Sequence, residues 1–347
     1  SLCAPAQRVM TLAQCIDYAI SHNVNIKRYA NNVEQQKVQL STARNSRLPD
    51  LTAGASQNFN FGRGLNSENT YVNRNTQSTG FNLQTSVPLL TGGRIPNEVA
   101  LNRLNLQAAT ADLEHARQSI ALQVAAAYLQ AVYAAEVVKV QEAQVAFSKV
   151  QEDRIAKLFK AGKSPESDVV EARSQVAQDE MGRTQAKCDY KLAMLDLSQL
   201  LELPSPDSIG VVAPEGETSA TLPPLPDQIF ARAEGIKAEI QAEKLRLQAA
   251  EKNIRIAKAA LYPTLSLGAG LSSQYYKTSG FSAPSFSKQL SDNFNKSIGL
   301  SLNIPIFNRL ATRNSIRQAK LQQNEQALQL DETKKTLYKE IQQAYYN

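Results

Sequence analysis

The spacing of apolar residues predicts a helix early in each half of the chain. Over 11–46 apolar residues recur at helical spacing among polar ones, with no internal Gly or Pro. They are Ile16, Ala19, Ile26, Val33 and Leu40, and the matching set over 227–260 is Ile229, Ala233, Ile236, Ile240, Leu247 and Ile254. Pro49 and Pro263 follow these segments. Proline ends a helix because it has no N–H to donate and disfavours helix in the residue before it.

After each proline the apolar period changes to two. Apolar residues alternate with small polar ones in four segments, at 50–61, 79–89, 264–275 and 296–305. Two-faced strands of about ten residues are typical of the wall of a membrane β-barrel. The polar face of the first pair carries Asn58, Asn60, Asn82 and Gln84. We expect these four to line a water-filled pore. A soluble sandwich is the alternative, but so uniformly polar a second face disfavours it.

The two halves also match each other residue by residue. Residues 43–56 (ARNSRLPDLTAGAS) align with 257–270 (AKAALYPTLSLGAG), and 86–90 (SVPLL) with 303–307 (NIPIF). The same register brings Ala127-Tyr128 over Ala344-Tyr345. We therefore predict two copies of one supersecondary unit, 11–200 and 227–347, joined by a Pro-rich crossover over 201–226. The second copy has no counterpart of roughly 132–200, so we expect that it is truncated.

A much longer helix is predicted over 97–161. Its apolar seam has heptad spacing, and a second apolar line lies on another face. The seam is Ile120, Val124, Ala127, Ala131, Ala134, Val138 and Val145; the second line is Leu122, Leu129, Tyr133, Val137 and Val140. Gly162 suits a left-handed C-cap, Ser164 the N-cap of a return helix over 166–200, and Pro165 its first turn. A helix with two apolar faces indicates a wall of helices rather than a compact bundle.

The segments that link the paired strands, 62–79 and 273–295, are polar and rich in Asn, Ser and Gly, so we expect exposed loops. Four strands cannot close a membrane barrel, and an open sheet would leave unpaired edges in hydrocarbon. The strand count therefore predicts assembly with further copies of the chain.

Composition narrows the function class. The 347 residues carry 38 Lys and Arg against 32 Asp and Glu, a net charge of +6 that is spread along the chain and gives little support for nucleic-acid binding. No uninterrupted apolar run is long enough for a spanning helix. The two His and three Cys form no zinc-ligand spacing, and we find no catalytic constellation. We therefore expect no enzyme, cofactor or metal site. Ala4-Pro5-Ala6 fits the end of a secretory signal, so 1–7 is expected to be a signal remnant or N-terminal tail.

These features together resemble the TolC-type outer-membrane efflux proteins. The resemblance rests on the two-fold repeat, the strand entries LPDL and YPTL, and the strand exits VPLLTGGR and IPIFNR. It also rests on the hairpin FKAGKSPESDV at 159–169, which is similar to the family's periplasmic tip motif. The resemblance covers the chain from Leu12 onward.

The resemblance implies a mixed α and β fold in a homotrimer. Four strands per subunit would form a twelve-stranded barrel in the outer membrane of a Gram-negative bacterium, continued by an α-helical tunnel through the periplasm. It also implies that the hairpin tip docks on a periplasmic adaptor (membrane fusion) protein of an inner-membrane RND or ABC pump. Carried over by position, the candidate adaptor contacts are Gly162, Lys163, Ser164, Pro165, Glu166, Asp168 and Val169.

The function expected from this resemblance is a passive exit duct for efflux or type I secretion. The alternative is a soluble periplasmic coiled-coil structural or adaptor protein. The sequence does not distinguish drugs, metal ions, siderophores and polypeptides as the cargo of this duct.

Overall fold

The computed structural model describes residues 8–65, 68–213 and 224–346. The expected signal remnant at 1–7 and the middle of the Pro-rich crossover lie outside the described residues. The chain divides into two compact units. Unit 1 is Ser1–Val33, Ala109–Glu239 and Glu340–Asn347, and unit 2 is Glu34–Ala108 and Ile240–Lys339.

Helices and strands are both present, so the mixed fold class is confirmed. The helices are α1 (Leu12–His22), α2 (Val24–Asn45), α3 (Arg94–Lys160), α4 (Glu166–Leu200), α5 (Pro226–Ile236), α6 (Ala238–Ala259), α7 (Phe286–Asp292) and α8 (Ala311–Tyr346). The strands are β1 (Arg8–Met10), β2 (Asp50–Asn60), β3 (Arg63–Leu65), β4 (Tyr71–Asn73), β5 (Thr76–Thr91), β6 (Ile209–Val211), β7 (Thr264–Thr278) and β8 (Asn295–Asn303). A short 3-10 helix, Pro206–Ser208, precedes β6.

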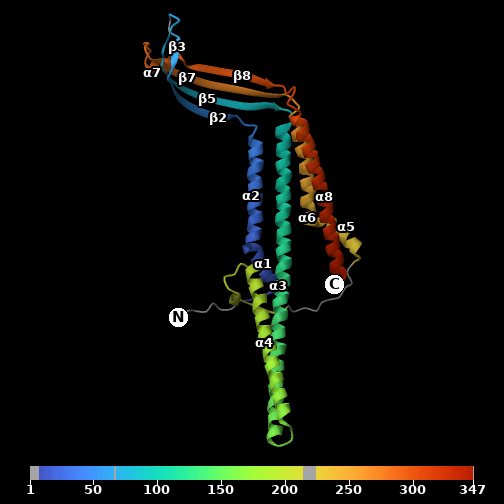
Figure 1. Ribbon diagram of the computed structural model, residues 1–347. Coiled ribbons are helices and arrows are strands. Elements are labelled where there is room, and N and C mark those ends of the chain that lie inside the picture. Colours follow the sequence, from blue (N-terminus) through green and yellow to red (C-terminus); the bar gives the residue numbers. More distant parts are fainter. Residues whose placement is uncertain (1–7, 66–67, 214–223, 347) are drawn as a thin grey trace. The chain divides into compact units, whose positions relative to one another are not determined.

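Unit 2 contains the antiparallel sheet β2-β5-β7-β8 (Figure 1). β5 and β7 are longer than the sequence pattern predicts, because each continues to the row where Thr76 pairs with Thr278. The alternation expected through Leu89 is interrupted by an irregularity between Pro88 and Leu90, which brings Leu90 opposite Leu265. Proline cannot donate a ladder hydrogen bond, so a bulge at this place fits its chemistry.

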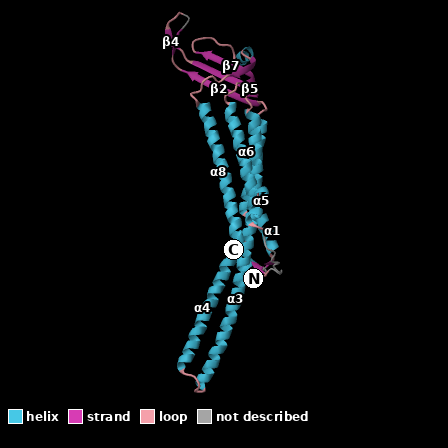
Figure 2. Ribbon diagram, turned by 90° about the vertical axis from the view of Figure 1, so that its right-hand side faces the viewer, coloured by secondary structure: helices cyan, strands magenta, loops and turns pink. Residues whose placement is uncertain are grey.

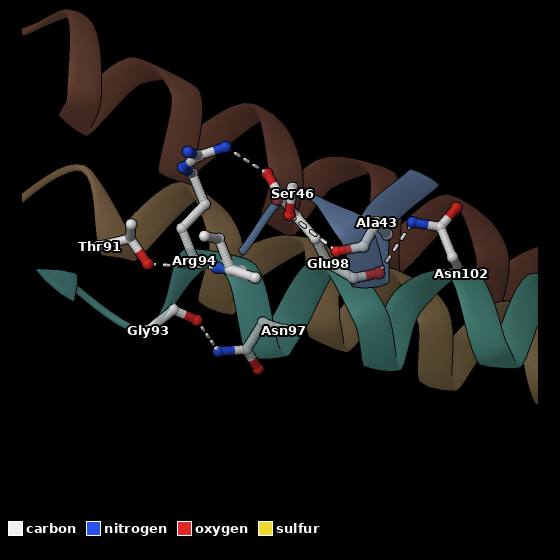
Figure 3. A network of polar contacts seen from close by, with 9 residues as sticks. Ala43, Ser46, Thr91, Gly93, Arg94, Asn97, Glu98 and Asn102 are labelled. Carbon is white, nitrogen blue, oxygen red and sulfur yellow. Dashed lines mark hydrogen bonds and ion pairs between the residues drawn. The ribbon is translucent and has the colours of Figure 1, made fainter. Parts of the chain in front are cut away.

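The turn from β5 into α3 is fixed by two glycines and by polar side chains (Figure 3). Gly92 and Gly93 have φ angles of +59° and +83°, which L side chains rarely adopt. The Ile95 amide donates to Thr91 Oγ1 at 3.5 Å, and Asn97 Nδ2 donates to the Gly93 carbonyl at 2.7 Å. The first contact gives an acceptor to the Ile95 amide, one of the N–H groups that the start of a helix leaves unpaired, and the second ties the Asn97 side chain to the turn.

Each of the two early helices is broken into two. The helix expected over 11–46 splits at Asn23 into α1 and α2, and the one expected over 227–260 splits at Lys237 into α5 and α6. Asn23 is buried and satisfies two helix ends at once. Its Oδ1 accepts from the Asn25 amide at 2.9 Å, and its Nδ2 donates to the Leu200 carbonyl at 3.1 Å. The break therefore depends on a partner 177 residues away, which helical periodicity does not reveal.

The core of unit 1 gathers α1, the start of α2, α3, the end of α4 and the small parallel sheet β1-β6. The first five residues of the heptad seam of α3, from Ile120 to Ala134, lie in or against it, with Val124 and Ala131 fully buried. α3 nevertheless contains an 18-residue window of mean hydropathy 1.3, so its length and composition alone would allow a membrane span. The lack of an uninterrupted apolar run therefore does not by itself exclude a membrane-spanning helix. Only 28% of that window is buried within the described chain, so packing of the seam accounts for part of its hydropathy.

Tyr128 ties α3 to both strands of the small sheet. Its side chain is 1% exposed, and its hydroxyl lies 3.0 Å from the Met10 carbonyl and 2.8 Å from the Val212 carbonyl. The same hydroxyl accepts from the Val212 amide at 3.0 Å.

We expect Tyr128→Phe to lower the stability of the protein by about 1–3 kcal/mol, because it removes the hydroxyl that bonds the backbone of Met10 and Val212 while the ring still fills its place. Tyr133, on the exposed side of the same helix, is the matched control, and Tyr133→Phe should change stability by less than about 0.5 kcal/mol. Thermal and denaturant midpoints, followed by circular dichroism, test this. Equal midpoints for the two variants would contradict the assigned role of the hydroxyl.

The core also holds Cys15, whose pKa is raised from 9.0 to about 11 because burial disfavours the charged thiolate. Cys188 on α4 is exposed. We expect a thiol reagent near neutral pH to label Cys188 and to leave Cys15 unmodified until the protein unfolds, since the thiolate is the nucleophile. Peptide-level mass spectrometry reads the two sites separately. Fast labelling of Cys15 in the folded protein would contradict its burial.

The same pKa difference has a definite sign for stability. Between pH 9 and 11 the folded state keeps a proton on Cys15 that the unfolded state has lost, so stability falls as pH rises through this window. Cys15→Ala removes that contribution, and the comparison of the two proteins isolates it from other groups.

Candidate functional site

The hairpin tip between α3 and α4 is closed by a Schellman motif. The Lys163 amide donates to the Leu158 carbonyl at 2.9 Å, and the Gly162 amide donates to the Phe159 carbonyl at 2.9 Å. Gly162 has a φ angle of +69°, which confirms the predicted left-handed C-cap. The end of Figure 2 at which α3 and α4 are joined by a short loop shows this turn.

The predicted N-cap is wrong by one residue. Pro165, not Ser164, is the N-cap of α4, with φ −75° and ψ 163°, and no side chain caps the helix there. The Ser164 hydroxyl instead donates to Asp168 Oδ2 at 2.6 Å, and the Ser167 hydroxyl lies 3.3 Å from the other carboxylate oxygen. The carboxylate of Asp168 thus competes successfully for the hydroxyl that would otherwise accept a backbone N–H, and it holds the loop against the start of α4.

The structure separates the seven candidate contact residues into two sets. Gly162, Lys163, Pro165 and Glu166 are exposed, and Ser164 and Asp168 are half-buried. Val169 is only 7% exposed. The exposed set presents one cation and one anion at the turn, whereas Ser164, Asp168 and Val169 support its shape.

Charge pairs connect the two helices of the hairpin along its surface. Lys187 lies 2.7 Å from Glu142, and one heptad along each helix Lys149 lies 2.6 Å from Glu180. A hydrogen bond to the paired lysine lowers the pKa of each of these two glutamates. Such exposed pairs contribute little each, and they weaken in salt and as acid protonates the carboxylates. Few buried residues lie between the helices: Val145 and Ser148 from α3, and Val169, Val176 and Ala186 from α4.

A groove lies beside the tip, between α3 and α4. Its volume is about 400 Å³, and its lining includes Phe147 and Ile155 from α3 and Asp168 and Ala172 from α4. Apolar side chains lie at its wall together with carboxylates, so it could receive a side chain of mixed character from a partner.

The second candidate site is the polar face of the β2-β5-β7-β8 sheet. Residues directly opposite in an antiparallel pair share a face. The register places Asn82 opposite Gly54, Gln84 opposite Thr52, Asn58 opposite Ser78 and Asn60 opposite Thr76. Asn60 Nδ2 donates to Thr76 Oγ1 at 3.3 Å. The four residues predicted to line a pore therefore lie on one face, and all four are exposed.

The opposite face of the same sheet is apolar over most of its length, and the rows run across strands from both halves of the chain. One row joins Leu300 to Leu267 and Val87, and the next joins Ile298, Ala269, Thr85 and Leu51. A further row joins Leu271, Leu83 and Ala53. Ile298 is 83% exposed and Leu300 is 66% exposed, so within the described residues no layer covers this face at β8. The face is too large and too regular to be incidental on a soluble protein.

The expected loops contain structure that the sequence pattern does not predict. β3 and β4 form a small hairpin within 62–79, and α7 lies within 273–295. The signal available for α7 was Ser285 at the N-cap, followed by Phe286 and Leu290 at helical spacing. In the described part of the chain no group of three or more His, Cys, Asp or Glu side chains could hold a metal ion.

Comparison with known proteins points to one family. The outer membrane efflux protein model matches residues 15–202 and 232–347. BepC, an outer membrane efflux protein of Brucella suis biovar 1 (strain 1330), is 25% identical over 321 residues, which cover 92% of this chain and 66% of BepC. SilC of Salmonella typhimurium, described as a probable outer membrane lipoprotein, is 24% identical over 349 residues, which cover 95% of this chain and 68% of SilC.

The fold agrees with these matches. The crystal structure of the Campylobacter jejuni CmeC outer membrane channel aligns with a TM-score of 0.78 at 18% identity, over 94% of this chain and 68% of CmeC. This chain thus spans about two thirds of the length of the relatives it matches. Because the family model covers most of its residues, the chain belongs to the outer membrane efflux protein family.

Proposed function

We propose that this chain forms an outer-membrane exit duct of a tripartite efflux or type I secretion system, through which substrates pass from an inner-membrane pump to the exterior. The observation that carries the proposal is the two-faced sheet, with Leu and Ile on one face and Asn, Gln, Ser and Gly on the other. An apolar outer face suits lipid, and a polar inner face suits a water-filled bore.

The proposed assembly is a homotrimer with a twelve-stranded barrel. In the described part of the chain, β2 pairs only with β5 and β8 pairs only with β7, so the sheet has two free edges. Unpaired edges are not tolerated in hydrocarbon, and pairing of β8 in one subunit with β2 in the next would remove both. The number of three copies comes from the family resemblance.

We also propose that the chain is a two-fold repeat. α1 and α5 each have 11 residues, and α2 and α6 each have 22 residues. Each pair of helices leads into a strand that begins next to its proline, β2 after Pro49 and β7 after Pro263. Two copies of one unit explain why the four strands of one sheet come from both halves.

The helical part is proposed to form a periplasmic α-barrel. The second apolar line of α3 supports this, because several of its residues are exposed although they lie at heptad-like spacing: Leu122, Leu129, Tyr133 and Val140. Phe147, one heptad beyond Val140, extends the exposed line. A helix of another subunit is the occupant that such a line fits.

Adaptor docking is assigned to the hairpin tip. Gly162, Lys163, Pro165 and Glu166 are its accessible residues, and the Schellman turn and the Ser164–Asp168 hydrogen bond fix their positions. The partner is a periplasmic adaptor protein that belongs to an RND or ABC pump. For this role the tip has to bind the adaptor through its shape and charge and catalyses no reaction.

The duct is tested by extraction and reconstitution of the full-length protein. We expect it in the outer-membrane fraction, soluble only in detergent, as a trimer by light scattering, and conducting ions in planar bilayers. A monomer that stays in the aqueous fraction without detergent would overturn the proposal in favour of a soluble periplasmic coiled-coil protein.

Docking is tested by a photoreactive amino acid at position 163 in cells. We expect it to capture a periplasmic adaptor, whereas the same group at exposed Lys191, on α4 away from the tip, should not. Capture of the adaptor from position 191 but not from 163, at equal expression, would place docking elsewhere on the hairpin.

A further inference from the structure

α7 lies against the apolar face of the sheet, at the end where the strands meet their loops. The Phe286 ring lies 6.5 Å from the Phe81 ring and 5.2 Å from the Tyr275 ring. Register places Phe81 opposite Ala55 and Tyr275 opposite Thr79, on the same face as Leu83 and Leu271. The helix therefore borders the face that the proposed function assigns to lipid.

Hydrogen bonds hold α7 in this place. Gln289 is 8% exposed, accepts from the Tyr276 amide at 2.9 Å and donates to the Pro284 carbonyl at 3.0 Å. The Ser273 hydroxyl donates to the Leu290 carbonyl at 2.7 Å, and Asn293 Nδ2 donates to the Gln274 carbonyl at 2.7 Å. These bonds fix α7 to β7 at the loop end of the sheet, which we call the rim.

A groove on the sheet lies at the same end. Its volume is about 480 Å³, and most of its exposed lining is apolar. Besides Gly54, Asn82, Ser272 and Ser273, the groove is lined by six apolar residues: Ala53, Ala55, Phe81, Leu83, Leu271 and Phe294. All except Phe294 are on the apolar face by register, and Phe294 comes directly before β8. A saturated hydrocarbon chain is the ligand that such a surface fits.

The rim beside the groove is positively charged. Residues 277–296 carry Lys277, Lys288 and Lys296 against one acidic residue, Asp292. Lys296 pairs with Leu271 and so lies on the apolar face, and its ammonium lies 5.5 Å from the Phe294 ring centre. A lysine on a lipid-exposed face is tolerated where its ammonium reaches the headgroup level.

We propose that this rim binds a phosphate-bearing anionic lipid, with an acyl chain in the groove and the headgroup phosphate attracted by the exposed lysines of the rim, Lys288 on α7 and Lys296 at the start of β8. The inference rests on the proposed function, because it needs the apolar face to lie in a bilayer. Charge complementarity selects the anionic lipid over a neutral one: lysines near an anionic lipid surface strengthen binding by about fivefold each.

The test uses tryptophan fluorescence, because the 347 residues contain no Trp. Phe286→Trp places a reporter on α7 in the full-length protein, reconstituted into vesicles of phosphatidylcholine and phosphatidylglycerol. Two vesicle preparations have the same overall composition, but the acyl chains of only one lipid are brominated in each. We expect several-fold stronger quenching when the bromines are on phosphatidylglycerol than when they are on an equal amount of phosphatidylcholine.

The lysines are tested in the same background. Lys288→Gln with Lys296→Gln should abolish the preference for phosphatidylglycerol. Lys191→Gln with Lys320→Gln, which removes two exposed charges from helices, should leave it unchanged. Equal quenching from both lipids, or a preference that survives the rim substitutions, would overturn the headgroup site.

A second reporter separates this inference from the proposed function. Leu300→Trp lies on the apolar face of β8 at a distance of several rows from the rim. If that Trp is quenched and the one at 286 is not, the lipid site is wrong and the lipid-facing sheet stands. If neither is quenched by either brominated lipid, the sheet does not face lipid and the proposed function fails as well.

Discussion

Ile298→Lys in β8 should reduce the amount of assembled protein in the outer membrane by tenfold or more. Ile298 is 83% exposed in the chain, yet it lies on the apolar face one row beyond Lys296, in the row with Ala269, Thr85 and Leu51. A lysine at mid-depth on the lipid face of a membrane barrel costs about 2–4 kcal/mol. Since 1.4 kcal/mol is a factor of ten in an equilibrium, the loss is large enough to measure by membrane fractionation.

The exposure of Ile298 makes this test decisive. On a protein surrounded by water, replacement of an exposed isoleucine by lysine would change stability by no more than about 0.5 kcal/mol and would favour solubility. The two environments therefore predict opposite outcomes for the same substitution. No buried residue of the chain offers this contrast, because its replacement by lysine is harmful in either environment.

Ser301→Lys in the same strand is the matched control. Ser301 pairs with Ser266 and lies on the polar face, where a lysine would meet the water of the proposed bore. We expect normal assembly of this variant in the outer membrane, and a change in ion selectivity of the channel. Comparable losses for both variants would show that the two faces of β8 do not differ in their exposure to lipid. Normal assembly of both variants would show that the apolar face does not lie in the membrane.

Local periodicity predicted the two-faced strands because each side of a sheet is set by a period of two that any ten residues reveal. The period of two is enough to predict that one face of the sheet carries four polar residues: Asn58, Asn60, Asn82 and Gln84. The order β2-β5-β7-β8 is also favourable to such reasoning, since the two strands of each half pair with each other. The long helix α3 was equally accessible, because no Gly or Pro interrupts residues 97–160.

Some of the features that were missed depend on partners outside their own segment, and one depends on a local competition. The break at Asn23 needs the Leu200 carbonyl, and Glu202 on the same loop accepts from the Val24 amide at 3.1 Å. Ser164 lost its expected capping role to a carboxylate four residues ahead, a local competition that residue preference alone does not settle. α7 is held by backbone groups of β7, so its place on the sheet could not be derived from its own seven residues.

Gly92→Ala should be among the most damaging single-methyl additions in unit 2. Gly92 has a φ angle of +59°, so any L side chain there adds about 1–2 kcal/mol of backbone strain. The new Cβ would also lie 2.6 Å from the Ala259 carbonyl oxygen and 2.8 Å from Tyr262 Cβ. Overpacking of this kind costs about a further 1–3 kcal/mol. The contact is with backbone at the end of α6, so no rotamer change can relieve it.

The neighbouring glycine provides the control, because it shares the backbone strain and lacks the clash. Gly93 has a φ angle of +83°, and a Cβ there would meet only Asn97 Nδ2, at 3.7 Å. Gly93→Ala should therefore lower the unfolding midpoint moderately, and Gly92→Ala should lower it roughly twice as far and reduce the yield of assembled protein. Truncation of Tyr262 to Ala should not rescue Gly92→Ala, since both the Tyr262 Cβ and the Ala259 carbonyl remain. Circular dichroism of the protein in detergent gives the midpoints, and equal effects of the two substitutions would show that α6 does not pack closely against the turn from β5 into α3.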